Sequence, residues 1–446
     1  MTKSFVLKTR LSAMNFLEFA VWGSYLISMG MFLSRHGLAQ HIFWFYTVQG
    51  LVSIIMPALM GIVADKWIPA QKTLSLCHLL AGGFMILTGY LGSVEGDIAF
   101  GPLFTCYTLS VAFFMPTIGL CNSVAFNALE KNGLSTVTDF PPIRVFGTVG
   151  FICAEFFVNF VNIGGEAIQY TNAQFYMSGI ISLALALYCL TMPNCPVNKG
   201  SSKSLADALG FKAFKLFKSP HMAVFFIFSM LLGVSLQITN SYGSSFINLF
   251  NEVPGYIGGF WAKNPTFLIS ISQISEALCI LMIPFCMKKF GIKGVMLLAM
   301  FAWVIRFGFF GLGNTNADGV AFLIISCIVY GVAFDFFNVS GGIYVDTKVA
   351  PEQRSSAQGL FMLMTNGIGA SIGTYIAGEF VVNKLVPFSG TPAEQLAGWR
   401  ESWFIFAAYA LVVALLFWII FKEKHDEMQT SHSQAEDTVA KDSETI

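Results

Sequence analysis

The sequence is poor in charged residues. Only 11% of its 446 residues are Asp, Glu, Lys or Arg, whereas 55% are hydrophobic. A soluble domain carries about 25% charged residues, and a soluble chain of this length is usually divided by polar linkers. The shortage of charge therefore excludes an ordinary soluble protein and indicates a chain that crosses a membrane many times. The formal net charge of +0 argues against nucleic acid as a partner.

The sequence also lacks the motifs of enzymes and metal sites. Its nine cysteines are scattered singly, without a CxxC pair or a Cys/His metal spacing. HExxH and P-loop patterns are missing as well. We therefore expect no enzyme activity, no metal and no cofactor. A membrane sensor would need an output domain, and the polar segments 194–220 and 422–446 are too short to fold as one.

What the sequence has instead is a series of long apolar stretches. About 20 apolar residues are enough to cross a bilayer as a helix. Twelve stretches reach this length, and we predict an all-α membrane protein with twelve transmembrane helices. They lie near residues 12–34, 42–64, 73–92, 98–127, 142–162, 173–193, 221–247, 265–287, 292–313, 318–346, 355–383 and 399–421.

The positive charges give this arrangement an orientation. Of the 25 Lys and Arg residues, 20 would lie on one side, one lies within a span (Arg306), and the remaining four lie on the other side. Those four are Arg35, Lys263, Lys384 and Arg400. Because cytoplasmic loops carry the excess of Lys and Arg, we expect both termini in the cytoplasm.

The longest cytoplasmic connection divides the chain into two halves. Residues 1–193 and 221–421 would each form a six-helix bundle, joined by the loop 194–220. The polar tail 422–446 is expected to be disordered. Both halves place a Pro near the end of a span before a short basic loop, in MPALMGIVADKW and in IPFCMKKFGIKG. Two such repeats predict a substrate site at the membrane midplane, between the halves.

Three carboxylates lie at membrane depth. Glu276 and Asp335 sit in apolar stretches without Lys or Arg, and Glu18 lies one turn from Trp22. A carboxylate in this position costs about 2.5–3.5 kcal/mol on insertion scales and is retained where protons, ions or polar solutes move. Glu18 is equally compatible with a place in the cavity and with proton coupling.

Polar and aromatic side chains recur at helical spacing on several spans, which places each set on one helix face. These sets are Arg144, Thr148, Phe151 and Glu155; Gln237 and Asn240; Gln273 and Glu276; and Tyr330, Phe334 and Asn338. They could line a cavity, or they could join helices at about 0.6 kcal/mol per contact.

Three further residues have plainer interpretations. Arg144 could extend to the cytoplasmic surface, Arg306 is expected to pair with a carboxylate or a lipid phosphate, and His78 is expected to be a packing residue.

These groups suit a neutral, hydroxylated solute that carries a flat ring. Few fixed cations face the cavity, which disfavours a polyanion. A carboxylate accepts hydrogen bonds from vicinal hydroxyls, and a base stacked on an aromatic ring gains about 1–3 kcal/mol. A sugar joined to a planar base therefore fits better than a sugar alone, although a sugar or drug transporter stays an alternative.

Two resemblances support a transporter. The loop GIVADKW, with Gly61, Asp65 and Lys66, resembles the signature of the major facilitator superfamily, which implies that Asp65 helps to close the cytoplasmic side; an ordinary solvated loop pair is the alternative. The segments FLEFAVWGSYL, TDFPPIRVFGTVGF, SISQISEALCILMIPF and VYGVAFDFFNVSG resemble the bacterial nucleoside/proton symporters of that superfamily. The second resemblance implies uptake of purine and pyrimidine nucleosides, such as uridine and adenosine, with protons by a monomer in the lipid of the bacterial inner membrane.

The resemblance also implies a set of substrate-binding residues. They are Arg144, Thr148, Phe151, Gln237, Asn240, Gln273, Glu276, Tyr330, Phe334 and Asp335. Under it, Glu276 binds the ribose and Asp335 is the first choice for the proton carrier, followed by Glu276 and then Glu18. Glu18 departs from the amide of some relatives and adds the third titratable candidate.

Overall fold

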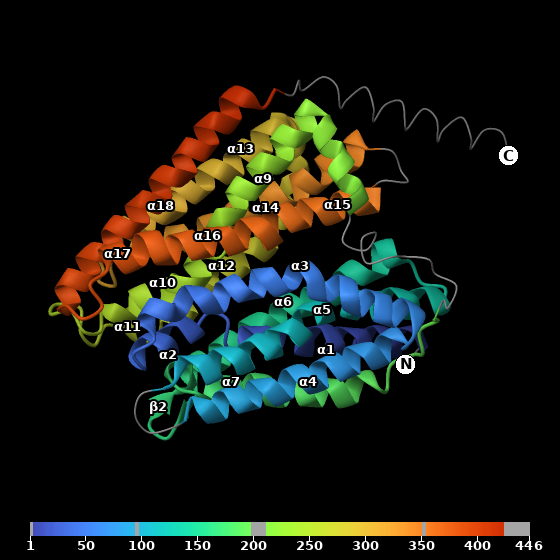
Figure 1. The fold of residues 1–446 in the computed structure, drawn as a ribbon, viewed down its shortest axis with the longest axis horizontal. Coiled ribbons are helices and arrows are strands. Elements are labelled where there is room, and N and C mark those ends of the chain that lie inside the picture. The colour runs from blue at the N-terminus through green and yellow to red at the C-terminus, as the bar shows by residue number, and fades with distance from the viewer. Residues whose placement is uncertain (1–2, 94–97, 198–210, 350–353, 423–446) are drawn as a thin grey trace.

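The computed structural model describes residues 3–93, 98–197, 211–349 and 354–422. Within them the chain is almost entirely helical. The one hairpin in these ranges pairs β1 (Asn162–Ile163) with β2 (Glu166–Ala167) in antiparallel register. The helices pack into two groups, which follow each other along the sequence (Figure 1).

The first group is built around α1, which packs on α6, and around α4, which packs on α5 and α7, while α3 covers α5. Its elements are α1 (Lys3–Gly23), α2 (Met29–Arg35), η1 (Ala39–His41), α3 (Ile42–Lys66), α4 (Ala70–Leu91), α5 (Phe100–Lys131), α6 (Thr136–Phe160), η2 (Ile168–Tyr170) and α7 (Ala173–Cys189).

The second group is built around α13, which packs on α14 and α18, with α12 on α14 and α9 on η6 and α16. Its elements are η3 (Phe211–Lys218), α9 (Pro220–Leu236), α10 (Ile238–Leu249), α11 (Phe260–Lys263), α12 (Pro265–Cys279), η4 (Ile280–Met282), α13 (Ile283–Leu312), α14 (Val320–Lys348), α15 (Arg354–Met362), η6 (Leu363–Gly369), α16 (Ala370–Ile376), η7 (Ala377–Val382), α17 (Asn383–Leu385) and α18 (Pro392–Ile420).

Every apolar stretch expected from the sequence is largely helical, but several are broken. The first divides between α1 and α2, and the seventh divides at Gln237 between α9 and α10. Gly291 has φ 66° and ψ 176°, so α13 changes direction there. This left-handed φ suits glycine because it has no Cβ. The π-helical segments η6 and η7 interrupt the eleventh stretch.

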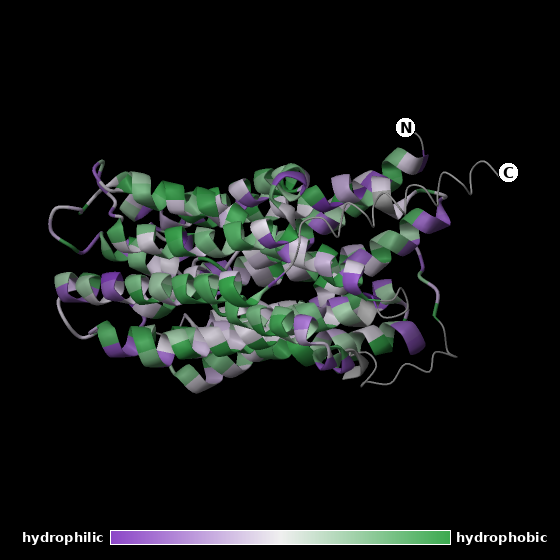
Figure 2. Ribbon diagram, turned by 90° about the horizontal axis from the view of Figure 1, so that it is seen from above, coloured by the Kyte–Doolittle hydropathy of each residue, from purple (hydrophilic) through white to green (hydrophobic). Residues whose placement is uncertain are grey.

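Helix length and hydropathy support a membrane protein. Among the described residues, nine helical runs are long and apolar enough to cross a membrane. One of them, Pro265–Leu312, contains two of the expected spans. The helices are hydrophobic along most of their length, and hydrophilic residues are more frequent towards their ends (Figure 2). The count of twelve spans and the cytoplasmic position of the termini stay predictions.

The two groups contact each other through α3 with α16 and η6, through α6 with α12, and at the end that carries α2, α10 and α11. Ser244 Oγ of α10 donates to the carbonyl of Ile27, and Asn383 Nδ2 donates to the carbonyl of Gln40 at 3.0 Å. Gly30 of α2 lies so close to α10 that a Cβ there would be 2.5 Å from the carbonyl oxygen of Ser241. We call this end, with α2, α10, α11 and β1–β2, the closed end.

The groups diverge towards the opposite end, where α1 begins (Figure 1). Two contacts here join elements of the same group. Lys8 Nζ of α1 lies 2.6 Å from Asp139 of α6, and Lys293 Nζ of α13 donates to the carbonyl of Trp418 at 2.9 Å. Residues 51–63 of α3 are all at least partly exposed. We call this end the open end.

Candidate substrate and proton site

Glu276 of α12 connects the two groups electrostatically. It interacts with Arg144 of α6 in the first group, and with Asp335 and Tyr330 of α14 in the second. The structure thus brings together a cation, two carboxylates and a phenol from three helices. Arg144 attracts Glu276, whereas Asp335 and Glu276 repel each other when both are charged.

Arg144 is partly exposed and packs against an aromatic ring and a glycine. Its Cζ is 3.9 Å from the ring centroid of Phe19 on α1, and its guanidinium contacts Gly147, where a Cβ would be 2.7 Å from Nη1. A guanidinium over an aromatic face gains about 0.5–2 kcal/mol. Phe19 therefore helps to hold the cation of Arg144 in place, and no motif or spacing in the sequence indicates this role.

Aromatic rings flank these charges from both groups. Trp22 contacts Phe151 edge to face, with centroids 6.2 Å apart and the planes at 86°. In the second group, Tyr330 and Phe334 are stacked one helical turn apart, with centroids 5.6 Å apart and the planes at 17°. The sequence predicted the latter pair from its i, i+4 spacing. Thr148 lies on α6 between Arg144 and Phe151 and is partly exposed.

The expected amides fall into two places. Asn240 Nδ2 donates to Gln237 Oε1 at 3.1 Å where α9 meets α10, and both side chains are partly exposed. Gln273 lies one turn before Glu276, and its Oε1 is buried without a hydrogen-bond partner among the described residues. An unpaired buried oxygen costs about 1–3 kcal/mol, which a ligand that donates a hydrogen bond would recover.

Asp335 is the most deeply buried carboxylate of the ten expected residues. Its exposed fraction is 4%, and its Oδ2 has no hydrogen-bond partner in the described parts of the chain. Burial of a charged carboxylate without a partner is costly enough for the group to take up a proton instead. The surroundings of Asp335 therefore suit a carboxyl group that gains and loses a proton.

The expected pairing of Arg306 with a carboxylate or a lipid phosphate is wrong. Its side chain is buried and donates to Thr239 Oγ1 at 3.0 Å, to Ser272 Oγ at 3.3 Å and to the carbonyl of Ser326 at 3.0 Å. Its Cζ is 4.3 Å from the ring centroid of Tyr330. Neutral oxygens from α10, α12 and α14 satisfy the guanidinium, and no spacing along the sequence could predict this three-helix set.

Glu18 lies inside the first group, where hydrogen bonds hold both of its oxygens. His78 Nε2 is 2.8 Å from Oε2, and Thr117 Oγ1 donates to Oε1 at 2.6 Å. His78 Nδ1 is 3.0 Å from Ser182 Oγ, so this histidine is a satisfied packing residue, as expected. Glu18 interacts with Arg144 and packs with the first group, apart from the pair of Glu276 and Asp335.

The expected gate motif lies at the open end. Asp65 is exposed at the end of α3, and Lys66 ends the helix. A Cβ built on Gly61 would meet nothing within 4 Å. Gly61 therefore leaves room for the close approach of a neighbouring helix, and no atom of the described residues fills that room within 4 Å.

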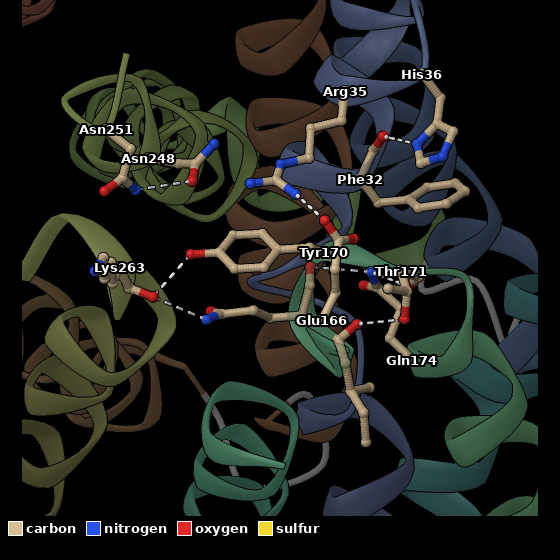
Figure 3. A network of polar contacts seen from close by, with 12 residues as sticks. Phe32, Arg35, His36, Glu166, Tyr170, Thr171, Gln174, Asn248, Asn251 and Lys263 are labelled. Carbon is tan, nitrogen blue, oxygen red and sulfur yellow. Dashed lines mark hydrogen bonds and ion pairs between the residues drawn. The ribbon is translucent and has the colours of Figure 1, made fainter. Parts of the chain in front are cut away.

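A polar network seals the closed end (Figure 3). Tyr170 Oη donates to the carbonyl of Lys263 at 2.7 Å, and Arg35 packs over the ring of Tyr170 while it pairs with Glu166 at 3.6 Å. Asn159 Nδ2 of α6 also donates to Asn264 Oδ1 at 2.7 Å. Sequence analysis missed these contacts, because they join loops and helix ends that are far apart in the sequence.

Comparison with known proteins identifies the family of this chain. The chain matches the family described as nucleoside H+ symporters over residues 5–426. Xanthosine permease of Escherichia coli (strain K12) is 43% identical over 95% of this chain and 98% of its own length. Nucleoside permease NupG of the same organism is 39% identical with the same coverage.

The fold agrees with these sequence matches. The crystal structure of the nucleoside transporter NupG superposes with a TM-score of 0.84 at 38% identity, over 94% of this chain and 100% of that one. The match extends over both helix groups, so the predicted family and the helical transporter fold are confirmed. The chain is a membrane transporter and belongs to the nucleoside H+ symporter family.

Proposed function

We propose that this protein takes up nucleosides together with protons across the bacterial inner membrane. The observation that carries the proposal is the electrostatic interaction of Arg144, from the first group, with Glu276, from the second, which interacts in turn with Asp335. A solute bound there contacts both groups, so its binding can be linked to their relative movement. The description of the family supplies the substrates of this site, which are nucleosides and protons.

The ten residues named from the sequence form the proposed substrate site. Glu276 accepts hydrogen bonds from the ribose hydroxyls, because a carboxylate offers two acceptor oxygens to vicinal donors. Gln273, Gln237 and Asn240 hydrogen-bond the base, and its faces pack against the rings of Phe151 and Phe334. Purine and pyrimidine nucleosides share these groups, so uridine and adenosine are both expected substrates.

Asp335 is the proposed proton carrier. It is buried with an unpaired oxygen and interacts with Glu276, so its protonation and the occupation of the nucleoside site influence each other. One proton that moves inward gains about 2.3 kcal/mol per 100 mV, which is enough for about 50-fold accumulation at about 1.4 kcal/mol per tenfold. Glu276 and Glu18 rank after Asp335 in this role.

We further propose twelve spans with both termini in the cytoplasm, in a protein that acts as a monomer. The open end then faces the cytoplasm, the closed end faces the outside, and this conformation is inward-open. Gly61, Asp65 and Lys66 would help to hold the cytoplasmic side closed.

Uptake by proteoliposomes tests the proposal. Labelled uridine and adenosine should accumulate against their gradients when an inward proton gradient is imposed, and a protonophore should abolish the accumulation. Excess unlabelled nucleoside should compete, whereas free sugars should not. Competition by sugars, or accumulation that survives the protonophore, would contradict nucleoside–proton symport.

A further inference from the structure

Glu155 is a buried carboxylate that belongs neither to the proposed substrate site nor to the contacts at the closed end. It lies one turn beyond Phe151 on α6 and one turn before Asn159, which bonds to the second group at the closed end. Its exposed fraction is 0%, and neither carboxylate oxygen has a hydrogen-bond partner among the described residues. It therefore sits between the substrate site and the contacts that seal the closed end.

The charged and titratable groups around Glu155 do not neutralise it. Glu276 of α12 is the group that acts on it, and Glu155 acts in turn on Tyr330 and Cys327 of α14. On the other elements packed against α6, the titratable groups have other interaction partners. Glu18 of α1 pairs with His78, Glu166 of β2 and Tyr170 of η2 contact Arg35, and Cys121 of α5 interacts with Glu18 and Arg144.

These surroundings decide the charge state of Glu155 in the closed arrangement. An ionised carboxylate that is buried without a cation or a donor costs so much free energy that the group is protonated instead. A second carboxylate nearby, Glu276, adds repulsion. With the closed end sealed, Glu155 therefore holds a proton.

Opening of the closed end would change the surroundings of Glu155. The contacts of Asn159 with Asn264 and with the backbone N–H of Phe267 lie one turn away, and they join α6 to α12. When they separate, water reaches Glu155 and the carboxylate can ionise. We propose that Glu155 is a proton-binding site, and that the extracellular end can close over it only after it has taken up one proton from outside.

The proposal rests on the proposed alternating access, and it predicts how the balance between the closed and open arrangements depends on pH. The closed arrangement binds one proton more than the open one, so low external pH favours closure and high pH favours opening. The closed-to-open ratio then changes by at most about tenfold per pH unit for one linked proton. Glu155 would return this proton to the outside on opening, whereas Asp335 releases its proton to the cytoplasm.

Hydrogen exchange of the purified protein tests the site directly. Amides of residues 159–170 and 260–267 report opening of the closed end, and rates are compared at pH 5 to 8 after correction for intrinsic exchange. Protection in the wild type should rise as the pH falls. In Glu155→Gln, which cannot ionise, these segments should stay protected and the pH dependence should disappear.

Two further variants make the result specific. Glu155→Asp keeps an ionisable group and should restore the pH dependence, which a merely structural defect of the glutamine variant would not predict. Glu252→Gln removes an exposed carboxylate in the turn after α10, at the same end, and it should keep the wild-type slope. An unchanged slope in Glu155→Gln, or loss of the slope in Glu252→Gln, would overturn the assignment.

Transport assays separate this inference from the proposed function. Failure of the wild type to accumulate nucleosides with a proton gradient would refute symport itself. Accumulation by the wild type, together with equal pH dependence of exchange in wild type and Glu155→Gln, would refute only the role of Glu155.

Discussion

At the scale of single residues, the site is organised by carboxylates whose partners differ. Glu276 interacts electrostatically with the cation of Arg144. Asp335 is buried, interacts with Glu276 and has an oxygen without a partner among the described residues, whereas Glu18 is held by His78 and Thr117. These surroundings suit different tasks. An accessible carboxylate near a cation suits ligand binding, a buried unpaired one suits proton exchange, and a fully hydrogen-bonded one suits packing.

Asp335→Asn should separate proton coupling from substrate movement. The amide fills the same space but cannot release a proton, so uphill uptake in proteoliposomes should be lost. Counterflow exchange of labelled for unlabelled uridine, which needs no net proton movement, should continue. Asp318→Asn neutralises a carboxylate in the loop before α14 and should keep both activities. Uphill uptake by Asp335→Asn would remove Asp335 from the role of carrier.

Glu276→Gln should weaken nucleoside binding. A hydrogen bond to a charged group contributes about 1.5–3 kcal/mol, so the Kd for uridine measured by calorimetry should rise by about 10- to 150-fold at about 1.4 kcal/mol per tenfold. Glu394→Gln changes a carboxylate that caps α18 and should leave the Kd unchanged. Equal affinities for wild type and Glu276→Gln would place the ribose elsewhere.

At the scale of elements, glycines decide how closely the helices of the second group approach. Gly369, Gly373 and Ala377 follow one another at intervals of four residues and form a ridge of small residues. In the structure Gly369 and Gly373 contact α9, where Gly233 completes the contact. A Cβ on Gly373 would lie 2.3 Å from the Cα of Val234, and backbone atoms cannot rotate away. Close helix approach of this kind supplies packing where lipid offers no hydrophobic driving force.

Gly373→Ala should therefore destabilise the protein. Overpacking of this kind costs about 1–3 kcal/mol, and the midpoint of thermal unfolding in detergent, followed by tryptophan fluorescence, should fall. Gly83→Ala is the matched control, because a Cβ on this exposed glycine of α4 would meet nothing within 4 Å. An unfolding midpoint for Gly373→Ala at or above that of the control would show that α9 and α16 can move apart without cost.

At the scale of the whole molecule, the balance between conformations depends on a few contacts at the closed end. The carbonyl of Lys263 accepts hydrogen bonds from Tyr170 and from Gln169, and Asn159 binds Asn264 nearby. All of these bonds join the first group to the second, so each must break when this end opens. Their loss should shift the conformational equilibrium without any change at the substrate site.

Tyr170→Phe should favour the arrangement in which this end is open. The ring that packs against Arg35 stays, and only the hydroxyl that donates to Lys263 is lost. A net hydrogen bond contributes about 0.5–1.5 kcal/mol, so the open fraction should rise by about two- to tenfold. Hydrogen exchange of residues 260–267 at constant pH measures this. Tyr90→Phe changes an exposed tyrosine, and its residues 260–267 should exchange at the wild-type rate. The same wild-type rate in Tyr170→Phe would show that the hydrogen bond contributes nothing.

Much of this protein could be predicted from its sequence, because a membrane imposes strong local rules. Backbone groups in lipid must be paired within a helix, so each apolar stretch had to be helical, as the structure confirms. Polar residues at helical spacing had to share a face, and Tyr330 and Phe334 do. The spacing rule is local, so it reaches only as far as one helix.

Tertiary structure decided which helices meet and which charges find partners. Arg306 is satisfied by hydroxyls and a carbonyl from three other helices, Glu18 by a histidine and a threonine, and Glu155 by none of the described residues. These outcomes depend on side chains that are distant in the sequence and adjacent only after the helices pack. The sequence by itself determined which residues had to be helical and which charges were costly, whereas the packing determined the surroundings of each charge, because electrostatic and hydrogen-bond energies depend on distance in space.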